Sequence, residues 1–399
     1  MKIKTTISLV IICIIIGGSF LFFSKKNNRI TASGYLVGSK IFTSFPVNEI
    51  VKFTITDATN SISLEKKNGV WIVDNYYDYP ADFNKIVNLL KKIYNLKVGQ
   101  TIRVRKESFR KLKLLEPSNS SAQISEKGIM IQFFENGGIS AARLLIGKPK
   151  YGKANNPYGY SPPIGQYVLL PDESLTELQS SKDKDNIILI NDAFNLILSS
   201  ETWIKRNLFN VKSDTIKEIK VTTPDKNVFV LSRTNKTETL TLKNIKSNEK
   251  TKASEINSLI SALQFFNIEK VVNPEIVSSN KLMENAWTYF TKTFGGTKYE
   301  LKISNTNLPN AYVQVKVDYE KPPVESVASN IAENVNIQMQ FETPENARKL
   351  NQLFAGRTYK ISNNTAGKLR KSRTDIIDII EKIKPKKIDK NVQSAKSAD

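Results

Sequence analysis

Residues 80–96 read PADFNKIVNLLKKIYNL, and residues 250–266 read KTKASEINSLISALQFF. After Asp82, apolar side chains recur every three or four positions, which predicts an amphipathic helix with one buried face. The second stretch repeats the apolar positions at a constant spacing of 170 residues: Ile86 with Ile256, Leu89 with Leu259, Leu90 with Ile260, and Ile93 with Leu263. The recurrence indicates an internal repeat in the chain.

The segments around the two helices follow the same order. In the first copy, residues 49–55 alternate as a half-buried strand, Asn68-Gly69 is typical of a hairpin turn, and Trp71 opens a third strand. A short strand then follows the helix at residues 101–104. The second copy predicts strands at residues 218–221, 229–231, 240–242 and 271–272. Ile102 and Val272 keep the spacing of 170 residues.

Each copy then continues into a hairpin. Residues 129–134 and 141–146 flank Gly137-Gly138, and residues 289–294 and 299–303 flank Gly295-Gly296. Strands at residues 167–170 and 312–315 would close the two sheets. Strand-turn-strand segments with one helix per copy predict mostly antiparallel sheets covered by a helix, which is an α+β fold.

The repeat sets the expected domain organisation. We expect the first α+β repeat at residues 40–180, a connecting segment at 181–214 that is helical over 186–209, and the second repeat at 215–320. A small strand-helix-strand unit is predicted at residues 335–362. Its strand covers 336–341, its helix begins at Thr343-Pro344-Glu345, and its return strand covers 358–361. Residues 363–399 are predicted as a basic, partly disordered tail with one amphipathic helix at 374–383.

The N-terminus predicts a membrane anchor within residues 1–29. Thr5 to Phe23 are nineteen consecutive residues without a charge, and as a helix they would span roughly 28 Å of bilayer core. A cleaved signal peptide is a poorer fit, because the charged residues 24–29 follow the run where a small-x-small site would be needed. A lipoprotein is also a poorer fit, because isoleucine surrounds Cys13. We expect a single-pass protein of the cytoplasmic (inner) membrane, with its bulk outside the cytoplasm.

Composition excludes several chemistries. The chain has no histidine, and its one cysteine, Cys13, lies in the apolar run. Ser-His-Asp and Cys-His nucleophiles and zinc sites built from His or Cys are therefore excluded. We predict a non-enzymatic protein without a cofactor, although carboxylate or Ser-Lys catalysis stays open.

The formal net charge is +21, but lysine is scattered through every segment. A nucleic-acid binder would cluster Lys and Arg with aromatic residues on one face, so we expect no nucleic-acid partner. The excess charge leaves open an attraction to anionic lipid headgroups or an anionic envelope polymer.

Several of these segments resemble the bacterial family called domain of unknown function 4340. The resemblance rests on the pattern of strands that ends in Trp71, the helix after Pro80-Ala81-Asp82, the strand end at residues 144–148, and residues 203–209. It covers roughly residues 40–320. It departs from the family pattern where Leu240 takes the tryptophan position in a weaker second copy. The resemblance implies an anchored accessory protein of the cell envelope, in some members associated with ATP-binding-cassette transporters related to gliding motility. It brings no catalytic residues.

The best candidate for a binding surface is the segment from Lys148 to Gln166. It combines tyrosines and lysines with glycine and proline, a composition that can stack sugars or hold an anionic polymer. The alternative is a long hairpin loop that has no binding role. The candidate residues are Lys150, Tyr151, Lys153, Tyr158, Tyr160 and Tyr167.

Other motifs favour structural roles. Ser63 and Lys66 have the spacing of Ser-Lys hydrolases, but in a strand their side chains point to opposite faces. The pairs Asp74 with Asp78 and Asp183 with Asp185 lack a calcium-loop pattern. Trp71, Trp203 and Trp287 are predicted as packing residues.

Three functions remain open. The first is a non-enzymatic scaffold anchored in the membrane, with a membrane protein or transporter as its partner. The second is a binding module for anionic glycans or lipids. The third is a carboxylate-dependent hydrolase.

Overall fold

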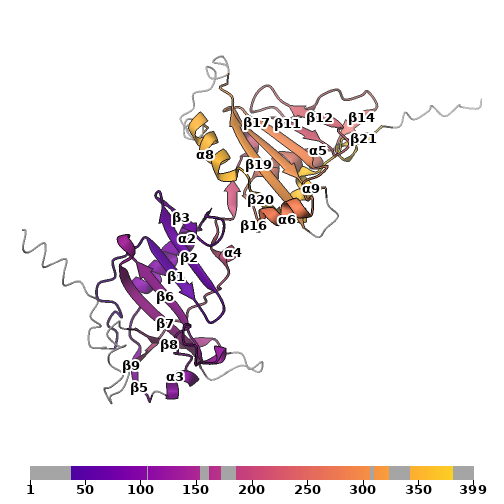
Figure 1. The fold of residues 1–399 in the computed structure, drawn as a ribbon. Coiled ribbons are helices and arrows are strands. Elements are labelled where there is room, and N and C mark those ends of the chain that lie inside the picture. The colour runs from indigo at the N-terminus through magenta and orange to yellow at the C-terminus, as the bar shows by residue number, and fades with distance from the viewer. Residues whose placement is uncertain are drawn as a thin grey trace, which may run out of the picture. The chain divides into compact units, whose positions relative to one another are not determined.

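The computed structural model describes residues 37–105, 107–152, 161–171, 186–305, 310–322 and 342–380. They form two compact units, the first ending at Lys205 and the second beginning at Arg206 (Figure 1). Among the described residues, no helix is long and apolar enough to cross a membrane. The predicted anchor at residues 5–23 lies outside them, so it stays a prediction.

One nine-stranded sheet forms the first unit, in the order β4-β3-β2-β1-β6-β7-β8-β9-β5. Every neighbouring pair in it is antiparallel. The strands are β1 Lys52–Thr56, β2 Ser61–Lys67, β3 Val70–Val73, β4 Tyr79–Pro80, β5 Gln100–Arg103, β6 Ile129–Phe134, β7 Ser140–Tyr151, β8 Pro163–Leu169 and β9 Asn186–Ile190.

Helix α2, Phe83–Tyr94, covers the inner face of this sheet (Figure 1). The Asp82 side chain accepts a hydrogen bond from the Asn84 N–H and caps the helix start. The four predicted apolar positions of α2 are all buried. Strand residues that face the same side, such as Phe53 and Phe133, are also fully buried. Apolar residues recur about every 3.6 residues on the helix and every second residue on the strands, so each element turns one apolar face to the same core.

The second unit has an eight-stranded sheet in the order β13-β12-β11-β17-β18-β19-β20-β16, again antiparallel throughout. Helix α5, Ala253–Ile260, begins at the position equivalent to α2, and helix α8, Pro344–Phe354, packs along β19. The strands are β11 Ile216–Thr222, β12 Val228–Ser232, β13 Thr241–Leu242, β16 Lys270–Val272, β17 Trp287–Thr293, β18 Thr297–Ile303, β19 Ala311–Tyr319 and β20 Thr358–Ile361.

The two sheets share one strand order. If β1 is matched with β11 and the chain is followed onward, β2, β3, β6, β7, β8, β9 and β5 match β12, β13, β17, β18, β19, β20 and β16. The mostly antiparallel α+β class is confirmed, and the order agrees with the repeat read from the sequence. Leu240 and Trp71, both buried, occupy matching positions beside β2 and β12.

The predicted helix over residues 186–209 is wrong. This segment contains strand β9, the short helix α4 at Ser200–Trp203, and strand β10 at Asn207–Phe209. Strand β9 lies between β8 and β5 inside the first sheet. Ile187, Ile188 and Ile190 are fully buried because both faces of that strand are covered. The first unit therefore extends past residue 180, and the described residues from Asn186 to Lys205 belong to it.

The prediction of a separate C-terminal unit is also wrong. Helix α8 and strand β20 form where predicted, but β20 pairs with β19 and β16 and so completes the second sheet. The predicted strand at residues 336–341 lies outside the described residues. Within the predicted tail, residues 363–369 form helix α9, Asn363–Leu369, which buries Ala366 and Leu369.

A helix over residues 374–383 is wrong for the part that is described. A short turn at Thr374–Ile376 leads into strand β21, Ile377–Ile379, which pairs with β14, Glu249–Thr251. The isoleucines are not on one helical face, because Ile376 and Ile377 are buried while Ile379 and Ile380 are exposed. Residues 381–383 lie outside the described residues.

Both units end with the same return of the chain. In the first, Ile204 bridges Ala81 and the Asp82 N–H donates to the Trp203 carbonyl at 2.7 Å. In the second, Ile377 pairs with Thr251 and the Lys252 N–H donates to the Ile376 carbonyl at 2.8 Å. The last segment of each unit is thus hydrogen-bonded to the residue that begins its helix.

Candidate functional site: the outer face of the second sheet

Each sheet has an inner face, against helix α2 in the first unit and helix α5 in the second, and an outer face opposite. Residues paired across neighbouring strands share a face, and alternate residues along a strand change face. In β11, Ile219 and Val221 are buried on the inner face while Lys220 between them is exposed on the outer face. Register therefore allows the two outer faces to be compared position by position.

The outer face of the first sheet is covered by its own chain. Met130 pairs with Thr56, the last residue of β1, and with Leu145 of β7. These two side chains join a second hydrophobic cluster on which helix α3, Glu107–Lys111, places Phe109. The buried members are Phe109, Leu114, Met130, Leu145 and Ile187, with Val104, Leu112, Leu115, Tyr167 and Leu169 packed against them.

The matching positions of the second sheet are polar. Thr222 is the last residue of β11, and it pairs with Thr288, which pairs with Lys302. Lys302 in turn pairs with Gln314, whose side-chain amide donates to the Thr358 hydroxyl at 2.9 Å. Where the first sheet has Met130 and Leu145, the second has Thr288 and Lys302. Helix α6, Pro274–Ser279, which follows β16 as α3 follows β5, buries none of its residues.

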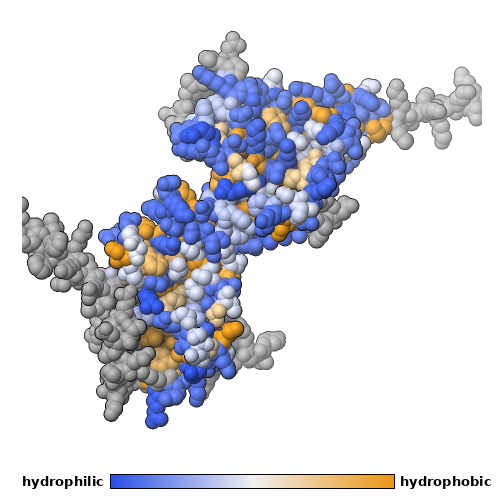
Figure 2. Space-filling model, viewed as in Figure 1, coloured by the Kyte–Doolittle hydropathy of each residue, from blue (hydrophilic) through white to orange (hydrophobic). Residues whose placement is uncertain are grey.

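Lysines dominate this outer face of the second sheet. Two rows run across four strands, one through Lys220 and Phe290 and the next through Lys292 and Lys298. A third row joins Tyr312 to Lys360 and Lys270. The lysines on outer positions of the strands are Lys220, Lys270, Lys292, Lys298, Lys302, Lys316 and Lys360, and the acids are Glu218, Glu300 and Asp318. In the space-filling view, hydrophilic residues cover most of the visible surface of the second unit (Figure 2).

Some of these lysines are neutralised and others are not. Glu320 forms ion pairs with Lys292 at 2.7 Å and Lys298 at 2.6 Å, and hydrogen bonds from both lysines lower the pKa of Glu320 to about 2. Lys220, Lys302 and Lys316 are exposed, and no carboxylate of the described residues lies within ion-pair distance of them. The face therefore presents three cations that can take a ligand without breaking an existing ion pair.

Of the segment from residues 148 to 166 that was predicted to bind, the described residues lie mostly in strands β7 and β8. Lys150 and Tyr151 lie in β7, and Tyr151 is 57% exposed. Tyr167 lies in β8 and packs against the outer hydrophobic cluster, so it is a packing residue of the first unit. Gln166 beside it is buried and donates to the Gly147 carbonyl. Lys153, Tyr158 and Tyr160 lie outside the described residues, so the loop itself stays a prediction.

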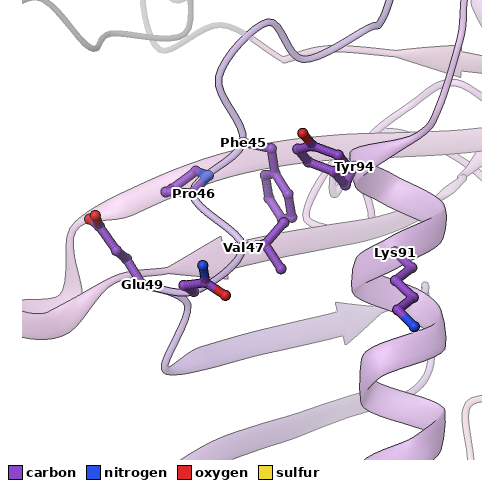
Figure 3. Close-up of a pocket in the computed structure, with 7 residues that line it drawn as sticks. Phe45, Pro46, Val47, Glu49, Lys91 and Tyr94 are labelled. Atoms are coloured by element: carbon purple, nitrogen blue, oxygen red, sulfur yellow. The ribbon is translucent and has the colours of Figure 1, made fainter.

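A shallow groove of about 420 Å³ lies in the first unit between residues 45–49 and helix α2 (Figure 3). The Phe45 ring lies between the loop and the helix, with Tyr94 at one end and Glu49 at the other. The Lys40 ammonium lies 3.5 Å from the centre of the Tyr94 ring. Among the described residues that line the groove, Glu49 is the one that carries a carboxylate. Burial and the nearby Glu49 carboxylate raise the pKa of Glu135.

The motifs with weaker chemical signals have structural surroundings. Ser63 lies in β2 on the face opposite to Lys66, as predicted. The Lys67 ammonium contacts both Asp74, at 2.8 Å, and Asp78, at 3.4 Å, and lowers the pKa of Asp74. Asp183 and Asp185 lie outside the described residues. Within the described ranges, no group of three or more potential ligand side chains is placed to hold a metal ion.

The three tryptophans differ in burial. Trp71 and Trp203 are buried and both pack on Phe53, which confirms their packing role. Trp287 is half-buried, and its indole N–H donates to the Asn305 side chain at 3.2 Å.

Sequence reasoning missed the outer face of the second sheet as a candidate site. A signal for it was present, because residues 298–302 and 314–318 alternate polar and apolar residues in neighbouring strands. Reading them as one surface required the strand order and the register, which the structure supplies.

Residues 179–284 match the family model described as domain of unknown function (DUF4340). The predicted resemblance is thereby confirmed over a shorter range than expected. The DUF4340 match runs from the end of the first unit to the segment that follows α6, and it includes α5 and the lysine-bearing strand β11. A comparison with curated proteins finds no match to the chain.

Proposed function

We propose that this protein is a non-enzymatic scaffold of the cell envelope, anchored in the cytoplasmic membrane by residues 5–23, with its two units outside the cytoplasm. The observation that carries the proposal is the combination of one shared strand order with two different outer faces. Two copies of one fold that differ in what they expose can hold two different partners.

The shared interior supports a binding role more than a catalytic one. Both inner faces are covered by the helix that begins at matching positions, α2 or α5, and by the returning segment near the end of the described unit, with Ile86 and Leu259 fully buried. The residues that distinguish the units instead lie on flat, outward strand positions. Flat surfaces that differ in polarity suit the binding of macromolecules.

A membrane protein is the expected partner of this scaffold. By its resemblance to DUF4340 proteins, the chain would accompany a transporter of the ATP-binding-cassette type related to gliding motility. The test is affinity purification of the full chain from membranes solubilised in a mild detergent. We expect a transporter subunit to co-purify in a stable ratio. Purification of the chain without any membrane protein would contradict the scaffold.

The topology of the anchor can be tested separately. Protease added to spheroplasts should degrade residues after position 37 while leaving cytoplasmic proteins intact. Protection of the whole chain until the membrane is dissolved would contradict an extracytoplasmic body.

A second function, binding of an anionic envelope ligand, is favoured by one specific observation. Lys220, Lys302 and Lys316 stand exposed on one sheet face without a carboxylate partner among the described residues. The two functions are compatible, because a scaffold held at the membrane can also attach to the envelope material around it.

A further inference from the structure

We propose that the outer face of the second sheet is a binding track for a linear, carboxylate-bearing polysaccharide. The inference rests on the proposed envelope location and names the ligand class of the lysine face. It starts from the surface that the first unit covers with Phe109 and the second leaves polar.

The lysines form a diagonal track across the sheet. Lys270 and Lys360 pair with each other at one edge, Lys302 and Lys316 follow on β18 and β19, and Lys220 lies on β11. Five strand-to-strand steps separate β16 from β11, which is about 24 Å at roughly 4.8 Å a step. A surface of that length is matched by an extended polymer and exceeds any single headgroup.

The chemistry of the side chains fits carboxylates on sugar rings. Lysine supplies a compact point charge on a flexible stem, and none of the outward strand positions named above carries arginine, whose planar fork favours bidentate binding of phosphate. Phe290 lies half-buried in the middle of the track, between Lys220 and Glu300 in register, and Tyr312 lies in the next strand but one. A half-exposed ring among cations provides an apolar face for one face of a sugar.

The geometry also disfavours two other anionic partners. Binding to a bilayer surface needs exposed apolar side chains that enter the lipid, as well as positive charge. The outward positions on β18 and β19 instead carry the polar side chains of Lys302, Gln314 and Lys316. Single-stranded nucleic acid is usually held by successive stacking rings, whereas Phe290 is flanked in its row by Lys220 and Glu300.

The test compares two triple variants of the full chain in detergent micelles. K220Q/K302Q/K316Q removes the three lysines of the track that have no carboxylate partner among the described residues. K226Q/K236Q/K250Q removes the same charge from exposed lysines of the second unit that lie off this face. The probe is fluorescently labelled polygalacturonate at low salt, with neutral dextran as the uncharged reference.

We expect polygalacturonate to bind the natural chain and the control triple equally, and the track triple at least about tenfold more weakly, since each lysine near an anionic surface contributes about 1 kcal/mol. Binding should weaken as salt rises. It should also strengthen with oligomer length until the track is filled. Equal loss in both triples, or no binding by the natural chain, would overturn the proposal.

A gain-of-function variant sharpens the test. E320Q releases Lys292 and Lys298 from their ion pairs without removing a lysine. We expect it to bind polygalacturonate about threefold more tightly than the natural chain. Unchanged or weaker binding would place the ligand elsewhere.

Two further probes decide the ligand class. A single-stranded DNA oligonucleotide, or vesicles containing anionic phospholipid, should bind more weakly than polygalacturonate at equal salt, and the track triple should change their binding little. Stronger binding of either through the same lysines would overturn the polysaccharide. Co-purification of a membrane protein is a separate measurement. The proposal of a scaffold can therefore be contradicted while the proposal of a polysaccharide track is supported, or the other way round.

Discussion

The two outer sheet faces differ far more than the two inner faces. The first buries Met130 and Leu145 beneath Phe109, whereas the second places Thr288 and Lys302 at the same positions in solvent or polar contacts. Inner positions are mostly apolar in both copies, because each sheet must pack against a helix, although the buried Thr291 takes the position that Phe133 has in the first sheet. The comparison teaches that the fold is specified by one face of each sheet, which leaves the other free to take a separate role.

The largest effect should come from exchanging the two outer faces at one position. Leu145→Lys puts a charge into a fully buried cluster, and we expect it to destabilise the first unit by about 4 kcal/mol. The reverse change, Lys302→Leu, lies on an exposed position and should alter the second unit by less than about 1 kcal/mol. Urea unfolding followed by hydrogen exchange in each unit measures both. Equal effects of the two variants would remove the distinction between the faces.

The return segments provide a prediction in which the units should behave alike. Trp203 packs on Phe53 and Ile376 is fully buried at the equivalent position. Truncation by Trp203→Ala or Ile376→Ala should each cost about 3 kcal/mol in its own unit. Protease resistance of each unit, measured separately, is the readout. A loss confined to one of the two variants would show that the return segment matters in one copy alone.

The helix starts allow a smaller test. Asp82 caps α2 through its side chain, whereas Lys252 begins α5 without a side-chain cap. Asp82→Ala should cost about 1 kcal/mol, and Lys252→Ser should stabilise α5 by about 0.5 kcal/mol. Exchange rates of the first-turn amides report on both helices. A loss of stability in Lys252→Ser would mean that its exposed ion pair with Asp378 outweighs a cap.

The smallest expected effect is a change in how the stability of the second unit depends on acidic pH. Because Lys292 and Lys298 lower the pKa of Glu320 from an ordinary value near 4.5 to about 2, its contribution to stability is present above pH 4.5. That contribution should be lost as the pH falls from about 4.5 to about 2. In Glu320→Gln this part of the acid dependence should disappear, which melting temperatures across that range would show. An unchanged acid profile would place these ion pairs outside the stability of the folded state.

The sequence predicted the repeat well because helix periodicity and strand alternation are local signals. Ile86 and Ile256 begin matching apolar faces, and Trp71 in β3 matches Leu240 directly before β13. Segments buried on both sides gave the main error. Ile187 to Ile190 are apolar without alternation, and such a run fits a helix or a central strand equally well.

The remaining errors come from pairing across long sequence distances. Strand β20 joins β16 and β19, and β21 joins β14, so neither segment is a unit of its own. Trp203-Ile204 and Ile376-Ile377 were in fact a further match between the copies. The lysine face was missed for the same reason, because register alone brings Lys220 beside Phe290.

Thiol labelling tests the difference between the outer faces most directly. Cys13 is the only cysteine of the chain, so Cys13→Ser provides a background in which Leu145→Cys and Lys302→Cys can be compared singly. We predict that a maleimide reagent labels position 302 at nearly the rate of the unfolded chain and position 145 at least about a hundredfold more slowly, because opening the cluster costs several kcal/mol. Equal labelling rates in the folded protein would contradict a covered face in the first unit and an open one in the second.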